Sequence, residues 1–156
     1  MPAQRFPRRP AHHAIAAPAS RPSDAIHVYA NAGLPVPDAR VLRCAFDVAG
    51  GRNAAETILA EHPCVSAVFA VNDFAAISAL GAIRSDHRTA GADIAVVGYN
   101  DTPLAGELPF PLTTVRSPMR KMGAQAMTML LDRINGRPVE SLWLRPTLSI
   151  RESSMA

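Results

Sequence analysis

Apolar residues gather in short runs that alternate along the chain with stretches of helical spacing. Residues 65–71 (VSAVFAV) and 94–99 (IAVVGY) are nearly all apolar, which is typical of strands buried on both faces of a parallel sheet. Residues 39–46 (ARVLRCAF) are a third strand candidate. Residues 141–150 (SLWLRPTLSI) predict a closing strand that Pro146 interrupts.

Four segments place apolar side chains every three or four positions, the spacing of one helix face. They are residues 23–33, 50–63, 73–84 and 118–135. Because strand and helix alternate, the predicted fold class is α/β, with a mainly parallel sheet flanked by helices. Residues 102–114 are interpreted as a proline-rich loop.

The last predicted helix has the clearest boundaries. Ser117 is placed to cap it, Pro118 suits its first turn and Gly136 suits its end. Its apolar stripe comprises Met119, Met122, Ala126, Met129, Leu130 and Ile134.

Polar residues follow three of the predicted strands at the point where each strand ends. The pairs are Phe46-Asp47, Asn72-Asp73 and Asn100-Asp101. Ligands bind outside the carboxyl ends of the strands in an open parallel sheet, so these side chains are expected at one edge. An aromatic plane beside amide groups suits a polar ring such as a sugar or a nucleobase.

The same residues have a structural interpretation, because Asn and Asp also cap helices and form turns. Capping is the preferred interpretation of Asp73 and Asp101. Binding and capping both stay open for Asn72 and Asn100, and Phe46 taken alone fits a core position.

The chain has 156 residues, enough for one domain with a core, and a formal net charge of +3. Four of its 16 Lys and Arg residues lie within residues 1–22, which contain no acid, so 12 basic residues face 13 acidic ones in the remainder. That remainder therefore gives no sign of a nucleic-acid surface. Residues 1–20 are interpreted as a disordered Pro/Arg-rich arm, without the apolar stretch of an export signal.

Motifs of catalysis and metal binding are missing from the sequence. There is no Gly-x-Ser-x-Gly, His-Glu-x-x-His, glycine-rich phosphate loop or Cys-x-x-Cys. We therefore expect no enzyme activity, no cofactor and no metal site. Cys44 and Cys64 are expected to be buried free thiols in a reducing, cytoplasmic setting, and no apolar run is long enough to span a membrane.

From about residue 21 to residue 154 the chain resembles the effector-binding part of LacI/GalR-family transcriptional regulators. The strongest stretches are AVFAVNDFAAISALGAIR, ADIAVVGYNDTPLAGELPFPLTTVRSPMRKMGAQAMTMLLDRINGRP and the closing LSIRESS. The segment PLTTVRSPMRKMG is more similar to the regulators than to periplasmic sugar-binding proteins. The resemblance implies a periplasmic-binding-protein-like type I fold, in which a cleft between two α/β subdomains closes on a small molecule, commonly a sugar or a purine.

The resemblance also implies a set of ligand-binding residues. By position, Phe46 looks like the family's stacking aromatic, and Asn72 and Asn100 look like its hydrogen-bonding residues. The family usually has Asp where this chain has Asn100, so the amide offers a donor and an acceptor without a charge. Arg21 lies twelve residues before Gly33, where the family places a ligand-contacting arginine.

Family members begin with a helix-turn-helix that reads DNA and a complete amino-terminal subdomain, and neither is visible here. We therefore expect a truncated chain, in which residues 21–156 are a partial effector-sensing domain and DNA binding depends on a helix-turn-helix absent from it. Residues 118–135 are expected to belong to the missing subdomain, so their apolar stripe must be exposed, repacked or covered by another copy. Family dimers imply a homodimer through helix 73–84 and loop 102–110.

The sheet has no evident first strand, which the order 2-1-3-4-5 would place between residues 41–46 and 65–71. We expect a defective sheet unless residues 13–17 (HAIAA) fill the gap. The leading interpretation is an effector-binding fragment of a LacI-type repressor, for a sugar or purine-like ligand. A fragment of a periplasmic-type sugar-binding protein and a non-functional remnant stay open, whereas a small α/β enzyme is disfavoured.

Overall fold

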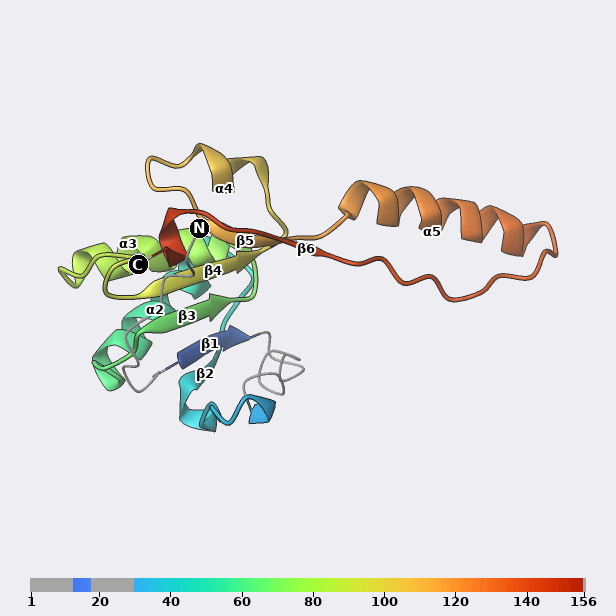
Figure 1. Ribbon diagram of the computed structural model, residues 1–156. Helices are drawn as coiled ribbons and strands as arrows, with labels where there is room; N and C mark the ends of the chain where they lie inside the picture. The colour runs from blue at the N-terminus through green and yellow to red at the C-terminus, as the bar shows by residue number, and fades with distance from the viewer. Residues whose placement is uncertain (1–12, 18–29, 156) are drawn as a thin grey trace, which may run out of the picture.

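A six-stranded sheet forms the centre of the protein in the computed structural model, which describes residues 13–17 and 30–155 (Figure 1). Its strands, in the order β2-β1-β3-β4-β5-β6, are β2 (Val41–Arg43), β1 (His13–Ala17), β3 (Ala67–Ala70), β4 (Ala95–Tyr99), β5 (Thr113–Arg116) and β6 (Thr147–Ser149). The first five are parallel to one another, and β6 runs antiparallel to β5. The prediction of a mainly parallel α/β sheet is confirmed.

Strand β1 fills the expected gap between β2 and β3, one strand in from the edge of the sheet. It pairs in parallel with β2 on one side and with β3 on the other, so that Ile15 lies opposite both Val41 and Phe69. The sheet is therefore continuous rather than defective. For residues 13–17 the prediction of a disordered arm over residues 1–20 is wrong, because pairing on both edges satisfies their backbone groups.

Helices α2 (Val48–Glu61) and α3 (Asp73–Ser85) pack against each other and supply much of the core. The alanine-rich face of α3 allows a close approach, and Ile58 of α2 and Ile83 of α3 are almost fully buried. They join the buried strand residues Val68 and Val96 in one hydrophobic cluster. Both helices were predicted from their apolar spacing. Most of the helix predicted at residues 23–33 lies outside the described residues.

Three predicted segments differ from the structure. The strand predicted at residues 39–46 is confined to β2, because Asp38–Arg40 form a turn of 3-10 helix before it. The loop predicted at residues 102–114 contains the short helix α4 (Pro103–Glu107), which Pro103 starts, and the first residues of β5. The closing strand is confined to β6, and Glu152–Ser154 form a second 3-10 turn after it.

Helix α5 (Met119–Ile134) extends away from the sheet, and residues 137–146 run back from its end towards β6 (Figure 1). Pro118 is its N-cap residue and makes no side-chain cap bond, so the prediction that Ser117 caps the helix is wrong. Gly136, with a φ of 71°, follows the end of the helix as predicted.

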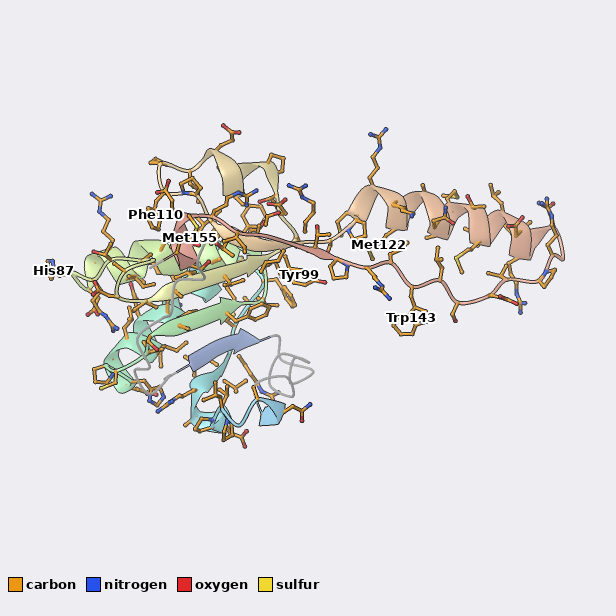
Figure 2. The ribbon with its side chains drawn as sticks, viewed as in Figure 1. His87, Tyr99, Phe110, Met122, Trp143 and Met155 are labelled. Carbon is orange, nitrogen blue, oxygen red and sulfur yellow. The ribbon has the colours of Figure 1, made fainter. Side chains whose placement is uncertain are left out.

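None of the residues of α5 is buried. The predicted apolar stripe is largely open to solvent in the single chain, with Ile134 70% exposed. Figure 2 shows Met122 and Trp143 on this projecting part, and Trp143 is 91% exposed. Within the described residues, no helix is long and apolar enough to cross a membrane.

Candidate ligand-binding site

Asn72 and Phe46 come together at the carboxyl edge of the sheet. Asn72 is the N-cap of α3, where its Oδ1 accepts a hydrogen bond from the N–H of Ala75 at 2.8 Å. Its Nδ2 donates to the carbonyl oxygen of Phe46 at 3.2 Å. The capping interpretation of Asn72 is therefore correct, and the same amide fixes the segment after β2 beside the end of β3. Its second N–H has no hydrogen-bond partner among residues 13–17 and 30–155.

Phe46 does not occupy a core position, because its side chain is 59% exposed. Phe46 lies in the short segment between β2 and α2, immediately before Asp47. Asp47 caps α2 by accepting a hydrogen bond from the N–H of Gly50 at 2.7 Å. The cap fixes the backbone beside Phe46, while the aromatic ring stays accessible. An exposed ring on an ordered backbone is suited to stacking against the apolar face of a ligand.

Asn100 differs from Asn72 in that its side chain makes no hydrogen bond to the described part of the chain. It directly follows β4 with a φ of 107°, and its N–H donates to the carbonyl oxygen of Val115 at 2.9 Å. Asn tolerates positive φ better than most residues. Capping is therefore excluded as its role, and its amide is available at the edge of the sheet.

A groove of about 780 Å³ lies where β4 and β5 end and α5 begins. Asn100 lines it together with Thr102, Arg116, Arg120 and Lys121. Figure 2 labels Tyr99, the residue before Asn100, at this edge of the sheet. Phe46 and Asn72 lie outside the lining of the groove, so the edge consists of a Phe46–Asn72 pair and a neighbouring groove with Asn100.

Asp73 and Asp101 do not cap helices, contrary to the preferred interpretation. Asp73 is fully buried, and its carboxylate accepts hydrogen bonds from the N–H of Thr102 at 2.6 Å and from the hydroxyl of Thr114. It therefore ties the start of α3 to β5 and to the start of α4. Capping was expected because Asp commonly caps helices and forms turns. The actual partners of Asp73 are 29 and 41 residues away in sequence, so the local pattern does not reveal them.

Asp101 joins β4 to β5 and β6 through charged partners. Its side chain is 4% exposed and forms ion pairs with Arg116 and with Arg151, the latter at 2.7 Å. Ser149 donates a further hydrogen bond at 3.2 Å. Burial by itself raises the pKa of Asp101, but the hydrogen bonds and charges of Arg116 and Arg151 outweigh it and hold the pKa below its ordinary value.

The remaining candidates have different outcomes. Arg21 lies outside the described residues. Cys44 is half-buried, and burial followed by the charge of Asp47 raises the pKa of its thiol, whereas Cys64 is exposed rather than buried as predicted. No three His, Cys, Asp or Glu side chains of the described segments lie close enough together to hold a metal ion.

Sequence reasoning missed the basic residues of the groove. Arg116, Arg120 and Lys121 stand in the run RSPMRK between β5 and α5. In the sequence they resemble the solvated face of a helix. The groove becomes visible only when the turn from β5 into α5 is placed beside the end of β4.

The fold and the edge define a class of protein, a mainly parallel α/β domain with an open groove at the carboxyl ends of its strands. The model of the Periplasmic binding protein-like domain family matches residues 10–154. The Lactose operon repressor of Rhizobium radiobacter is 37% identical over 101 residues, which are 60% of this chain and 89% of that protein. The chain therefore belongs to the LacI family of regulators, with a periplasmic-binding-protein-like domain.

Two further comparisons concern regulators with the name CelR. The HTH-type transcriptional regulator CelR of Thermobifida fusca is 37% identical over 110 residues, which are 69% of this chain and 32% of CelR. The solved complex of a CelR transcriptional regulator with cellobiose matches at a TM-score of 0.84 and 30% identity, over 91% of this chain and 46% of that one. The chain thus spans about a third of the length of the curated CelR.

Asp101→Asn is expected to destabilise the fold by about 2 kcal/mol at neutral pH, because hydrogen bonds to a charged group are lost. Since the pKa of Asp101 is lowered on folding, this stabilisation is present above the ordinary value of 3.8 and disappears as the pH falls through the pKa of the folded state. Urea denaturation from pH 7 to pH 3 measures both effects.

The matched control is Asp132→Asn, which breaks the exposed ion pair with Arg137 at 3.0 Å. We expect a change below about 0.5 kcal/mol for this variant. A destabilisation by Asp101→Asn that stays the same at pH 3 and pH 7 would contradict the electrostatic role of Asp101.

Proposed function

We propose that the chain is the effector-binding part of a LacI-type repressor and binds a small polar molecule, a sugar or purine-like ring, at the carboxyl edge of the sheet. The observation that carries the proposal is the amide of Asn100, which lines the groove and has no hydrogen-bond partner within the described residues. The exposed ring of Phe46 lies outside that groove, at the same edge of the sheet. The CelR complex with cellobiose supports a sugar. In this proposal the chain senses the effector in the cytoplasm, and DNA recognition depends on a helix-turn-helix outside it.

The roles of the two asparagines differ in this proposal. Asn72 holds Phe46 in place through its bond to the carbonyl oxygen at 3.2 Å and offers one remaining N–H to the ligand. Asn100 supplies a complete amide, which can donate and accept hydrogen bonds to neighbouring hydroxyl groups of a sugar. Neither residue is an acid, a base or a nucleophile at neutral pH, which supports a binding role without catalysis.

Replacing Asn100 by Gly is expected to weaken ligand binding about tenfold, the cost of roughly one net hydrogen bond. Glycine accepts the φ of 107° without strain, so stability should change little. The measurement is a titration of ¹⁵N-labelled protein with cellobiose, lactose, ribose and adenine, followed by the backbone amide signals.

Asn53→Ala, a change on the exposed part of α2, serves as the control and is expected to bind like the parent protein. Ligand binding should shift the signals near Phe46, Asn72 and Asn100. If none of the four compounds shifts these signals, or if both variants bind as the parent does, the proposed site is wrong.

We also propose that the chain forms a homodimer through helix 73–84 and loop 102–110. A largely apolar groove of about 380 Å³ between α3 and residues 108–110 supports this surface. Ile77 and Leu80 line it and also pack against the core, so they contribute to both. Figure 2 labels Phe110, another of the lining residues.

Gly81→Lys tests the dimer surface without disturbing the core. Gly81 lines the groove, and a Cβ there would meet only Arg52, at the ordinary distance of 3.5 Å. The added charge lies near Arg84 and Arg88, so we expect the dimer dissociation constant to rise at least tenfold in sedimentation equilibrium. Gly123→Lys, with no atom within 4 Å of the added Cβ, is the control. Equal association of the two variants would refute this surface.

A further inference from the structure

The groove beside Asn100 carries more positive charge than a neutral ligand requires. Arg116, Arg120 and Lys121 line it, and Asp101 is the single acid among its lining residues. The carboxylate of Asp101 is already paired with Arg116 and with Arg151. The negative charge in the lining of the groove is therefore neutralised, while Arg120 and Lys121 form no ion pair within the described part of the chain.

Arg120 and Lys121 lie in an unfavourable local setting. Both are exposed, and the first turn of α5 contains no acidic residue. The helix macrodipole disfavours positive side chains at this end of a helix. A local conflict of this kind is expected at functional sites, where a ligand supplies the missing interaction.

Thr102 adds a second unsatisfied group to the same groove. Its Oγ1 is buried and has no hydrogen-bond partner among the described residues, and Thr102 lines the groove together with Asn100. A buried polar atom without a partner is rare in native proteins, and a buried water molecule is the usual partner of such an atom. The lining of the groove thus combines the neutral amide of Asn100 with two positive charges that have no ion-pair partner among the described residues.

We propose that the groove binds an anionic sugar, whose hydroxyl groups reach Asn100 and whose carboxylate or phosphate group lies against Arg120 and Lys121. This inference rests on the proposed function and specifies the chemical class of its ligand. A volume of about 780 Å³ accommodates a charged monosaccharide. Charge-assisted hydrogen bonds from two side chains favour such a ligand over the neutral sugar of the same size.

The test uses glucose, glucuronate and glucose 6-phosphate in titrations of the ¹⁵N-labelled full chain. The two anions are expected to bind about tenfold more tightly than glucose and to shift the signals of Asn100, Arg120 and Lys121 together. Raising the salt concentration from about 0.05 M to 0.5 M should weaken the anions and leave glucose unchanged, because salt screens exposed charges. The comparison of glucuronate with glucose 6-phosphate distinguishes a carboxylate ligand from a phosphate ligand.

The decisive variants remove two positive charges each. Arg120→Gln with Lys121→Gln is expected to weaken binding of the preferred anion about tenfold and to leave glucose binding unchanged. Arg133→Gln with Arg145→Gln, on the exposed residues of the projecting part, changes the net charge equally and should have no effect.

Each other outcome has a defined meaning. Equal binding of glucose and the anions, unaffected by the groove variant, overturns the anionic class and leaves the proposed function standing. Shifts at Arg120 and Lys121 without Asn100, reproduced by inorganic phosphate, indicate an adventitious ion only and overturn the inference. If no compound, including the neutral sugars and adenine, shifts the signals of Asn72 and Asn100, the proposed function fails as well.

Discussion

The parallel pairing of β1 between β2 and β3 is the contact on which the candidate site depends. It places the carboxyl ends of β2 and β3 at one edge with one strand between them. The hydrogen bond from Asn72 to the carbonyl oxygen of Phe46 spans that separation. Without β1, strand β2 would have no strand partner, and only the Asn72 hydrogen bond and the packing of α2 on α3 would hold the segment with Phe46 and Asp47. The ligand platform is therefore a consequence of sheet continuity.

Two buried carboxylates organise the other half of the edge. Desolvation of Asp73 is costly, and hydrogen bonds from Thr102 and Thr114 compensate for it. The same packing requires a glycine at position 98, because a Cβ there would lie 2.5 Å from Oδ1 of Asp73. Asp101 connects the end of β4 to β5 and to the segment after β6 through ion pairs with Arg116 and Arg151. These contacts hold Asn100 and the beginning of α5 around one groove.

The elements of this fold with a regular apolar periodicity can be predicted from the sequence. The apolar runs that become β3 and β4, and the spaced apolar residues of α2 and α3, need no knowledge of distant contacts. Residues Thr113 and Thr114 are different, since they are polar by composition and buried in the structure, which is why β5 was interpreted as loop. Residues 13–17 were only a candidate for the missing strand, because so short and weakly apolar a segment is not assigned as a strand without the two neighbours that pair with it.

The site divides in the same way. The polar residues at the strand ends predicted a candidate site at the carboxyl edge of the sheet. The role of each side chain, however, depends on hydrogen-bond partners that are distant in sequence. Asn72 is a cap and Asp73 a buried acceptor, although they are adjacent in sequence. Only a three-dimensional arrangement separates such roles, because capping and tertiary hydrogen bonding use the same residue types. The basic residues Arg116, Arg120 and Lys121 were likewise not predicted as part of a site, because in the sequence they resemble the solvent-exposed face of a helix.

Native-state hydrogen exchange of the backbone amides in β1 tests the central claim most directly. If β1 completes the sheet, the amides of residues 14–17 exchange as slowly as those of residues 68–70 in β3, because both open only with the whole domain. Fast exchange in residues 14–17 beside slow exchange in β3 would contradict the account. The site would then lack the strand that joins Phe46 to Asn72.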